Sequence, residues 1–474
     1  MSSDRWSSRV GFLLATVGAA VGLGNIWRFS AVVGQNGGGA YLVPYLLAAF
    51  VCAVPMLVLE LTIGRQLRTD VVSAFRAVKV EYAAFGWLIT GGVLLILSYY
   101  LVLTGWVLGF LLSWLGGSQT TFATFTAAWL PVGYFAVATI ATGGIVSLGV
   151  RGGIERMSKV VMPTVFAVLV ALALYAVSLP AWGQAAAFLF TPRFSVLTDL
   201  GVWSAAFGQV FFSMSVGQGI MLTYGSYVDE RTNLLNSSLL ITVTDIAAAI
   251  IAGLVIFPIV FSFGLQPTLG TELAFTTLPT AFATMPFGRV VAVAFFGLLF
   301  FAALSSGVSL LEVGVAATAN TTRLSRPRAT LVLTAGVFLL GMPSALSYSP
   351  VRLAIAGRPV LDIVDESVGT FALPISALLI LFVFVWSVDL EAVREDLGPL
   401  YPLVRYLIPP VLVIVTAARA IGVARPAWRL LVDHARNGPT GLVLTVAVLL
   451  TFAGVGWVFR DRLPAPPRLR RRRQ

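Results

Sequence analysis

A small set of polar side chains interrupts the long apolar stretches of this chain. Its members are Asn25, Ser213, Asp245, Ser305 and Ser306. Amide, hydroxyl and carboxylate oxygens suit a hard cation such as Na⁺ and are poor ligands for soft metals. An aspartate at the centre of an apolar helix costs about 2.5–3.5 kcal/mol on insertion scales, and a bound cation would offset that cost.

The alternative for Asp245 is a carboxylate that reaches the membrane edge or pairs with a basic side chain. No Arg or Lys lies in the middle of a neighbouring apolar segment. The sequence therefore favours a cation site.

Two of the segments that carry these residues contain the same interruption, V-G-x-G. It occurs at Val21-Gly22-Leu23-Gly24 and again at Val216-Gly217-Gln218-Gly219. Glycine costs about 1 kcal/mol in a helix interior, so each pair favours local unwinding. Glycine-interrupted helices in corresponding positions of two inverted halves are typical of transporters. Close helix packing through small residues is the alternative, and the polar residues beside the breaks favour unwinding.

Composition places the whole chain in a membrane. Of 474 residues, 58% are hydrophobic and 11% are charged, with a mean hydropathy of +0.93. Soluble domains are about 45–50% apolar and about 25% charged, so a soluble fold is excluded. One Cys and one His exclude a disulfide framework and most Cys- or His-based chemistry. We therefore do not expect an enzyme.

We expect an all-α membrane protein with about twelve transmembrane helices. The apolar segments run over residues 10–33, 41–64, 86–115, 131–149, 157–179, 199–227, 237–263, 287–322, 327–347, 366–388, 402–424 and 440–459. We expect residues 1–400 to form a ten-helix transporter core and residues 401–460 to add two further helices. Residues 461–474 form a basic cytoplasmic tail.

The net charge of +11 reflects orientation in the lipid bilayer rather than binding to nucleic acid. Basic residues lie mainly in the loops that are cytoplasmic if the N-terminus is cytoplasmic, and Arg470–Arg473 lie just before the last residue, Gln474. The exception is a loop that should lie outside but contains Arg419, Arg425, Arg429 and Arg436. We expect a multi-pass protein of the cell membrane; the sequence leaves its oligomeric state open.

Ordered motifs in this chain resemble those of the neurotransmitter:sodium symporter family. They are GAAVGLGNIWRF at 18–29, NGGGA at 36–40, Tyr99-Tyr100, GQVFFSMSVG at 208–217 and FAALSS at 301–306. The resemblance covers the first ten helices. It implies a leucine-transporter-like fold, a 5+5 inverted repeat in which helices 1 and 6 are broken.

The resemblance also implies two Na⁺ sites and a substrate site between the broken helices. The first Na⁺ site would use Ala20, Asn25, Ser213 and Asp245 with the substrate carboxylate. The second would use Gly18, Val21, Ala302, Ser305 and Ser306. The substrate would contact Ala20, Gly22, Leu23, Gly24, Ile96, Tyr100, Phe212, Ser213, Ser215, Gln218, Ser306 and Leu310.

The family pattern further implies two gates. The outer gate would pair Arg28 with Asp365, while Tyr100 and Phe212 cover the substrate. The inner gate would involve Arg5, Trp6, Ser226, Tyr227 and Glu312. This chain departs from the pattern here: relatives pair a basic residue with an aspartate, at positions that hold Ser3 and Asn320. Arg5 is therefore expected to find another partner, with Glu312 the candidate.

Three residues indicate the substrate and ions. Gly22 stands where monoamine-carrying relatives have an aspartate, which implies an α-amino acid. Asp245 supplies a fixed negative charge, which predicts transport without chloride. Gln218 replaces a bulky aromatic side chain, which makes a purely aliphatic substrate less favoured. We expect a sodium-coupled symporter for a neutral α-amino acid; a non-transporting amino-acid sensor and a sodium-independent exchanger remain the alternatives.

Overall fold

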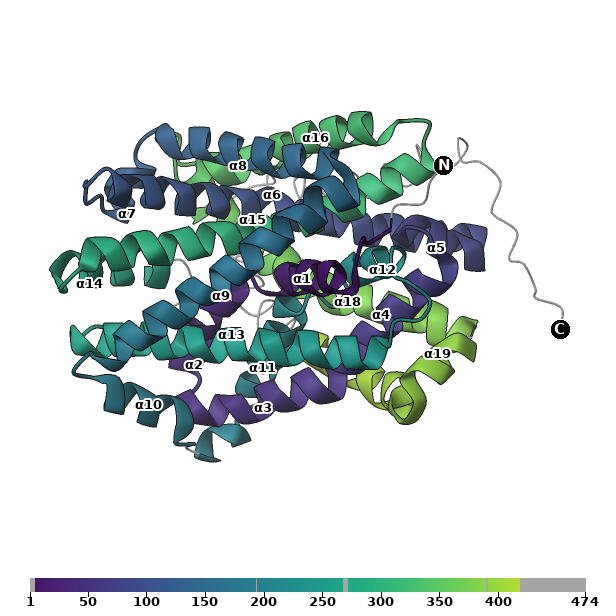
Figure 1. The fold of residues 1–474 in the computed structure, drawn as a ribbon, viewed down its shortest axis with the longest axis horizontal. Coiled ribbons are helices and arrows are strands. Elements are labelled where there is room, and N and C mark those ends of the chain that lie inside the picture. The colour runs from purple at the N-terminus through teal and green to yellow at the C-terminus, as the bar shows by residue number, and fades with distance from the viewer. Residues whose placement is uncertain (1–4, 193, 267–271, 389–390, 418–474) are drawn as a thin grey trace, which may run out of the picture.

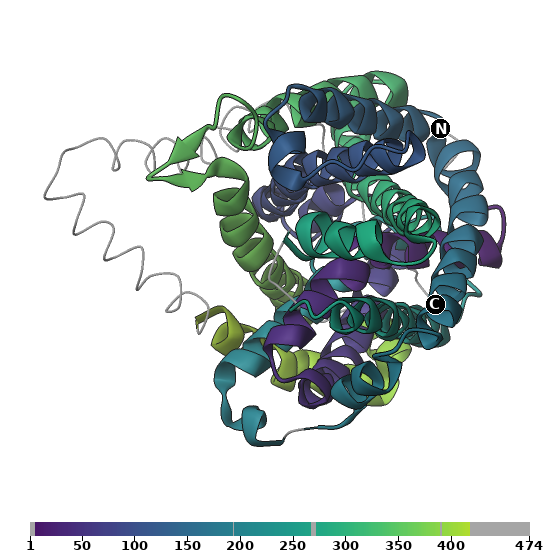
Figure 2. The same ribbon diagram turned by 90° about the vertical axis from the view of Figure 1, so that its left-hand side faces the viewer.

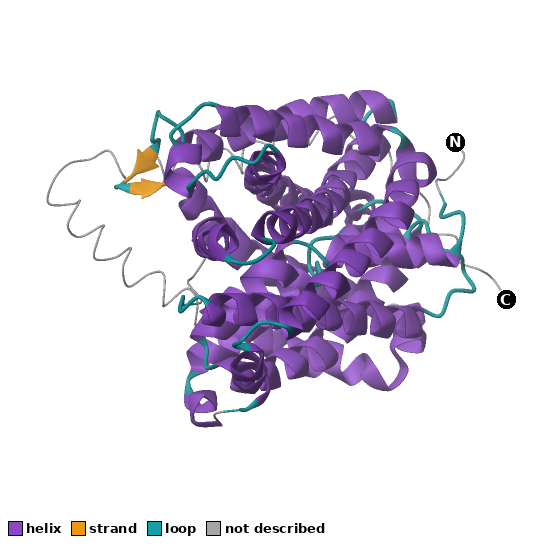
Figure 3. Ribbon diagram, turned by 60° about the vertical axis from the view of Figure 1, so that its left-hand side comes forward, coloured by secondary structure: helices purple, strands orange, loops and turns teal. Residues whose placement is uncertain are grey.

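The computed structural model describes residues 5–192, 194–266, 272–388 and 391–417, and these residues are almost entirely helical (Figures 1 and 3). The first nine α-helices are α1 (Arg9–Ala20), α2 (Phe29–Gln35), α3 (Leu42–Leu47), α4 (Val54–Leu67), α5 (Val71–Val78), α6 (Ala83–Leu115), α7 (Phe122–Thr126), α8 (Leu130–Ser147) and α9 (Arg156–Val177).

The described chain has ten further α-helices and two short strands. The other α-helices are α10 (Trp182–Phe190), α11 (Leu200–Ser213), α12 (Ile220–Gly225), α13 (Leu234–Ser262), α14 (Leu278–Thr284), α15 (Gly288–Thr321), α16 (Arg326–Ser347), α17 (Val360–Val364), α18 (Thr370–Leu381) and α19 (Glu391–Leu397). Short strands β1 (Ala354–Ile355) and β2 (Arg358–Pro359) pair antiparallel at the edge of the bundle (Figure 2).

The helices confirm a polytopic membrane fold. Within the described residues, eight helices are long and apolar enough to cross a membrane, and two bent helix pairs raise the number to ten. The expected segment 402–424 is described only as far as residue 417. The segment 440–459, the arginine-containing loop before it and the basic tail 461–474 lie outside the described residues.

The two broken helices occupy the middle of the bundle. In Figure 1, α1 and α12 lie between α6 and α15 on one side and α4 and α13 on the other. Helix α1 contacts α9, α13 and α15, while α12 packs against α4 and α15. The helix ends cluster at two opposite faces, with α5 and α19 at one and α7, α10 and α14 at the other (Figure 1).

The first broken helix bends by 53° between α1 and the helical segment Gly24–Gln35. Val21 takes an extended conformation (ψ 104°) that ends α1. The side chain of Asn25 then accepts a 3.0 Å hydrogen bond from the Gly22 amide, which the break has released from its helical partner. The expected unwinding is present, and a polar side chain next to the break satisfies one of the freed groups.

The second break separates α11 from α12 over residues 214–219. Ser215, Gly217 and Gly219 all have positive φ angles, of 55°, 79° and 69°. Glycine adopts this left-handed conformation without steric cost, so the two glycines permit the turn. The buried carboxylate of Glu60 accepts the Gly217 amide at 2.7 Å, which compensates for a helical bond that the turn removes.

Candidate ion and substrate site

A cluster of oxygen atoms lies where the two broken helices meet α13. Asp245 accepts hydrogen bonds from Asn25 Nδ2, at 2.6 Å, and from Ser213 Oγ, at 3.0 Å to each carboxylate oxygen. All three side chains are buried, and Ala20 lines the same small cavity as Ser213. The structure therefore brings together the residues expected at the first Na⁺ site. A buried carboxylate surrounded by neutral oxygen donors fits a hard monovalent cation.

The residues expected at the second Na⁺ site lie on α1 and α15. Ser306 Oγ lies 3.3 Å from both the Gly18 carbonyl and the Ala302 carbonyl. Ser305 Oγ is buried and has no hydrogen-bond partner among the described residues. A Cβ atom built on Gly18 would lie 2.3 Å from Ser305 Oγ, so only glycine allows the helices this close. An unpartnered buried hydroxyl beside backbone carbonyls also fits a cation.

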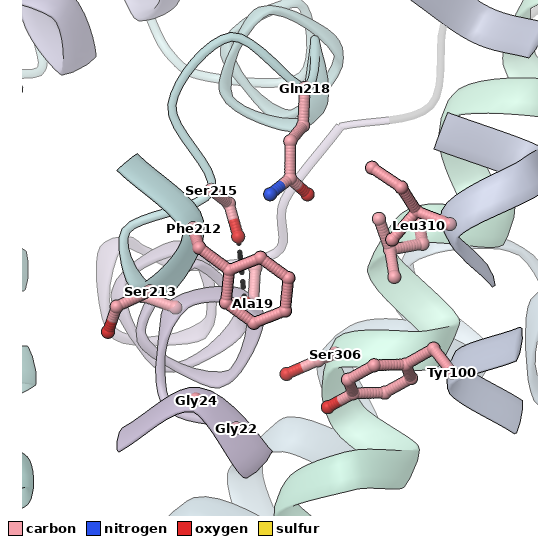
Figure 4. Close-up of a pocket in the computed structure, with 12 residues that line it drawn as sticks. Ala19, Gly22, Gly24, Tyr100, Phe212, Ser213, Ser215, Gln218, Ser306 and Leu310 are labelled. Carbon is pink, nitrogen blue, oxygen red and sulfur yellow. Dashed lines mark hydrogen bonds between the residues drawn. The ribbon is translucent and has the colours of Figure 1, made fainter. Parts of the chain in front are cut away.

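A small cavity lies between the breaks, with a volume of about 30 Å³. Its wall includes every residue expected to contact substrate except Leu23, together with Ala19 (Figure 4). Leu23 instead lines the vestibule above, and its amide lies 3.4 Å from Tyr100 Oη. Ala19 was missed because it contributes its backbone carbonyl and not its side chain. This carbonyl accepts a 3.0 Å hydrogen bond from Ser215 Oγ.

Gly22 lines this cavity next to the hydroxyl groups of Ser306 and Tyr100. A Cβ atom built there would lie 2.6 Å from Ser306 Oγ and 3.0 Å from Tyr100 Oη. Any side chain at this position would have to displace both hydroxyl groups. Glycine at this position therefore keeps the Ser306 and Tyr100 hydroxyls close to the backbone of the first break.

A larger cavity of about 770 Å³, called the vestibule, adjoins the small cavity on the side of the expected outer gate. Gly24, Tyr100 and Phe212 line both spaces, so they form the partition between them. Arg28 stacks on Phe212, with its guanidinium carbon 4.3 Å from the ring centroid. Arg28 and Asp365 both face the vestibule, but no ion pair joins these two described residues.

The inner side is closed by contacts around Trp6. Its indole donates a 3.1 Å hydrogen bond to the Tyr224 carbonyl, and its ring meets Tyr224 and Tyr227 edge-on. Tyr227 Oη donates to Glu312 at 2.8 Å. Ser226 lies in the same segment and donates to the Thr223 carbonyl.

The expected pairing of Arg5 with Glu312 is wrong. Glu312 is fully buried, and its ion-pair partner is Arg326, at the start of α16. Arg5 lies near Arg68 instead. The pKa of the Arg68 guanidinium is lowered mainly by burial and, as the second cause, by the positive charge of Arg5. The Arg5 carbonyl accepts a 2.7 Å hydrogen bond from Arg151. Arg326 was missed because sequence spacing does not show which of several loop arginines turns back towards a buried acid.

Two further polar contacts hold the inner face. Asn320, which replaces the gate aspartate of relatives, donates a 3.1 Å hydrogen bond to Asp70 at the start of α5. Its expected counterpart Ser3 lies outside the described residues. On α4, Arg65 forms an ion pair with Asp396 of α19 and donates to the Thr232 carbonyl at 3.0 Å. No motif or spacing indicates this pair, because it joins residues that lie far apart in the chain.

Comparison with known proteins identifies the family. A profile described as "Sodium:neurotransmitter symporter family" matches residues 3–130 and 134–402. The chain belongs to this family. It is 35% identical over 389 residues to an uncharacterized sodium-dependent transporter of Bacillus subtilis, covering 79% of this chain and 86% of that protein. A similar transporter of Methanocaldococcus jannaschii is 32% identical over 426 residues, covering 84% and 85% respectively.

A solved structure of the bacterial symporter MhsT with L-phenylalanine has the same fold. The TM-score is 0.81 at 38% sequence identity, covering 88% of this chain and 99% of MhsT. The family and fold expected from the motifs are thereby confirmed. The chain is a sodium-dependent symporter of a transporter family, not a member of an enzyme family.

Proposed function

We propose that this chain imports a neutral α-amino acid together with two sodium ions. The observation that carries the proposal is the contact between Asn25, Ser213 and Asp245 at the edge of the small cavity. A cation held there would lie next to a carboxylate bound in the space beside Gly22. MhsT, a symporter of similar sequence and fold, was solved with L-phenylalanine bound, which supports an amino-acid substrate here.

Coupling follows from this shared position. A substrate carboxylate and a sodium ion in contact each make the other's binding more favourable, and such coupling is reciprocal. The second ion would use Ser305, Ser306 and the carbonyls of Gly18, Val21 and Ala302. Each charge that moves inward through 100 mV gains about 2.3 kcal/mol, so two sodium ions provide a strong driving force for accumulation.

The transport route would run from the vestibule, past Tyr100 and Phe212, into the small cavity. The outer gate would consist of Arg28, which stacks on Phe212, and Asp365, which also lines the vestibule. This gate would close when the Arg28 guanidinium and the Asp365 carboxylate approach each other. The inner gate would consist of Trp6, Ser226, Tyr227 and the ion pair of Glu312 with Arg326. These contacts must separate before the substrate and sodium ions are released. Alternating opening of the two gates constitutes alternating access at the cell membrane, with the N-terminus cytoplasmic.

We further propose that transport requires no chloride. Asp245 places a fixed carboxylate beside the first ion group. The negative charge of this carboxylate would stabilise the bound sodium ion, so that a chloride ion is not needed for this purpose.

A sodium-gradient uptake assay in proteoliposomes tests the proposal. We expect uptake of a neutral amino acid that needs an inward sodium gradient and is unchanged when gluconate replaces chloride. Binding without uptake would indicate a sensor, and uptake that ignores sodium would indicate an exchanger. Either result would overturn the proposed coupling.

A further inference from the structure

Gln218 is a buried polar side chain without a hydrogen-bond partner in the described part of the chain. Only 3% of the residue is exposed, yet none of the hydrogen bonds described involves its side-chain amide. Figure 4 shows the amide pointing into the small cavity, towards Ser215 and Phe212. Gln209, the other buried glutamine near the breaks, instead donates to the Gly24 carbonyl at 2.7 Å.

The backbone holds this amide in place. Gln218 stands between Gly217 and Gly219, both in the left-handed region, and Glu60 fixes the amide of Gly217. A Cβ atom on Gly217 would lie 2.7 Å from the Leu373 carbonyl, and one on Gly219 would lie 2.5 Å from Val71. The turn is therefore tightly enclosed, and it projects Gln218 towards the cavity.

No hydrogen bond of the described structure joins the amide to another residue that lines the cavity. Ile96, Phe212 and Leu310 form apolar walls around it. The Ser215 hydroxyl already donates its hydrogen to the Ala19 carbonyl. Among the described residues that line the cavity, none carries an ionised side chain, so a charged ligand side chain would lack a counter-charge there.

We propose that the substrate carries an uncharged side chain with a hydroxyl or amide group, as serine, threonine, asparagine and glutamine do. This proposal rests on the proposed function of amino-acid transport. A carboxamide both donates and accepts, so it can form hydrogen bonds with either kind of group. A site built around a buried hydrogen-bonding group discriminates strongly against analogues that cannot satisfy it.

The experiment measures binding by thermal stabilisation of the full-length purified protein, with and without sodium. We expect serine, threonine, asparagine or glutamine to bind at least about tenfold more tightly than valine, leucine or phenylalanine. Gln218→Met keeps the length of the side chain and removes its hydrogen-bonding groups. We expect this variant to reverse the preference towards apolar amino acids, while Gln218→Asn, which keeps an amide, retains the preference for polar ones.

The outcomes separate the two proposals. If apolar amino acids bind wild-type protein most tightly in a sodium-dependent way, the proposed sodium-coupled amino-acid site stands and the assignment of Gln218 is overturned. An unchanged preference in Gln218→Met overturns it as well. If no amino acid stabilises the wild-type protein in sodium, the proposed function itself fails, and this inference with it.

Discussion

The backbone amide of Gly217 donates a 2.7 Å hydrogen bond to the buried carboxylate of Glu60. This contact joins α4 to the break between α11 and α12, where a helical hydrogen bond is missing. We expect Glu60→Ala to lower the free energy of unfolding by about 1–3 kcal/mol, because a buried amide loses its acceptor. Thermal unfolding in detergent measures the loss. Glu60→Gln keeps an acceptor oxygen and should lose less; equal losses would show that the Gly217 contact is unimportant.

Asp245→Asn should raise the sodium concentration that gives half-maximal uptake at least about tenfold, which corresponds to about 1.4 kcal/mol. The variant keeps the shape of the side chain but removes its negative charge beside Asn25 and Ser213. We also expect uptake by the variant to be stimulated by chloride. Asp199→Asn, at the exposed N-cap of α11, is the matched control. An unchanged sodium and chloride response in Asp245→Asn would contradict the first-site assignment.

Ser306→Ala should weaken substrate binding most strongly at low sodium. Its hydroxyl lies 3.3 Å from the Gly18 carbonyl, within the group proposed for the second ion. Titration of sodium at fixed substrate measures the shift. Ser309→Ala provides a control on the same helix, because Ser309 bonds to Tyr224 and the Ser305 carbonyl instead. Equal sodium dependence in the two variants would remove Ser306 from the ion site.

The stability of the inner face should depend on the protonation of Asp70. Burial raises the pKa of this carboxyl above its ordinary value of 3.8. The folded chain therefore holds the proton more tightly than the unfolded chain, so this group favours folding at low pH. The contribution is lost as pH rises from 3.8 through the raised pKa.

Asp70→Asn removes this component of the pH dependence and keeps both the helix cap and a contact with Asn320. Thermal unfolding of wild type and variant across the acid range measures the difference. We expect the melting temperature of the variant to change less with pH in this window. Identical pH profiles would show that Asp70 does not titrate differently on folding.

Arg65 and Asp396 should be energetically coupled. Their side chains are only 11% and 22% exposed, and Thr62 also donates to the same carboxylate at 2.8 Å. A double-mutant cycle with Arg65→Ala and Asp396→Ala should give a coupling of about 1–3 kcal/mol in the free energy of unfolding. The exposed pair Arg358 and Glu366, 48% and 42% exposed, should give less than about 1 kcal/mol.

Sequence reasoning reached the membrane fold from composition, and the resemblance to the family's ordered motifs implied most of the residues around the cavity. The glycine pairs marked both breaks, and Asp245 was conspicuous in an apolar segment. The partner of Glu312 was not accessible in this way. Arg326 approaches it through the turn between α15 and α16, and only the packing of those helices determines which arginine reaches the buried acid. The positions of Ala19 and Leu23 were inaccessible for a similar reason. The local geometry of the break decides that Ala19 lines the cavity and that Leu23 lines the vestibule.

The vestibule carries a charge opposite to that of the chain as a whole. Among the described residues, four acids line it (Glu272, Asp362, Asp365 and Glu366) against Arg28 and Arg358, on a chain whose net charge is +11. A concave surface with an excess of one sign of charge concentrates counter-ions at its mouth. We therefore expect sodium to be captured faster than diffusion to a neutral opening would allow. Dilution of the surrounding salt should strengthen that attraction, since screening weakens it over about 10 Å at 0.1 M ionic strength.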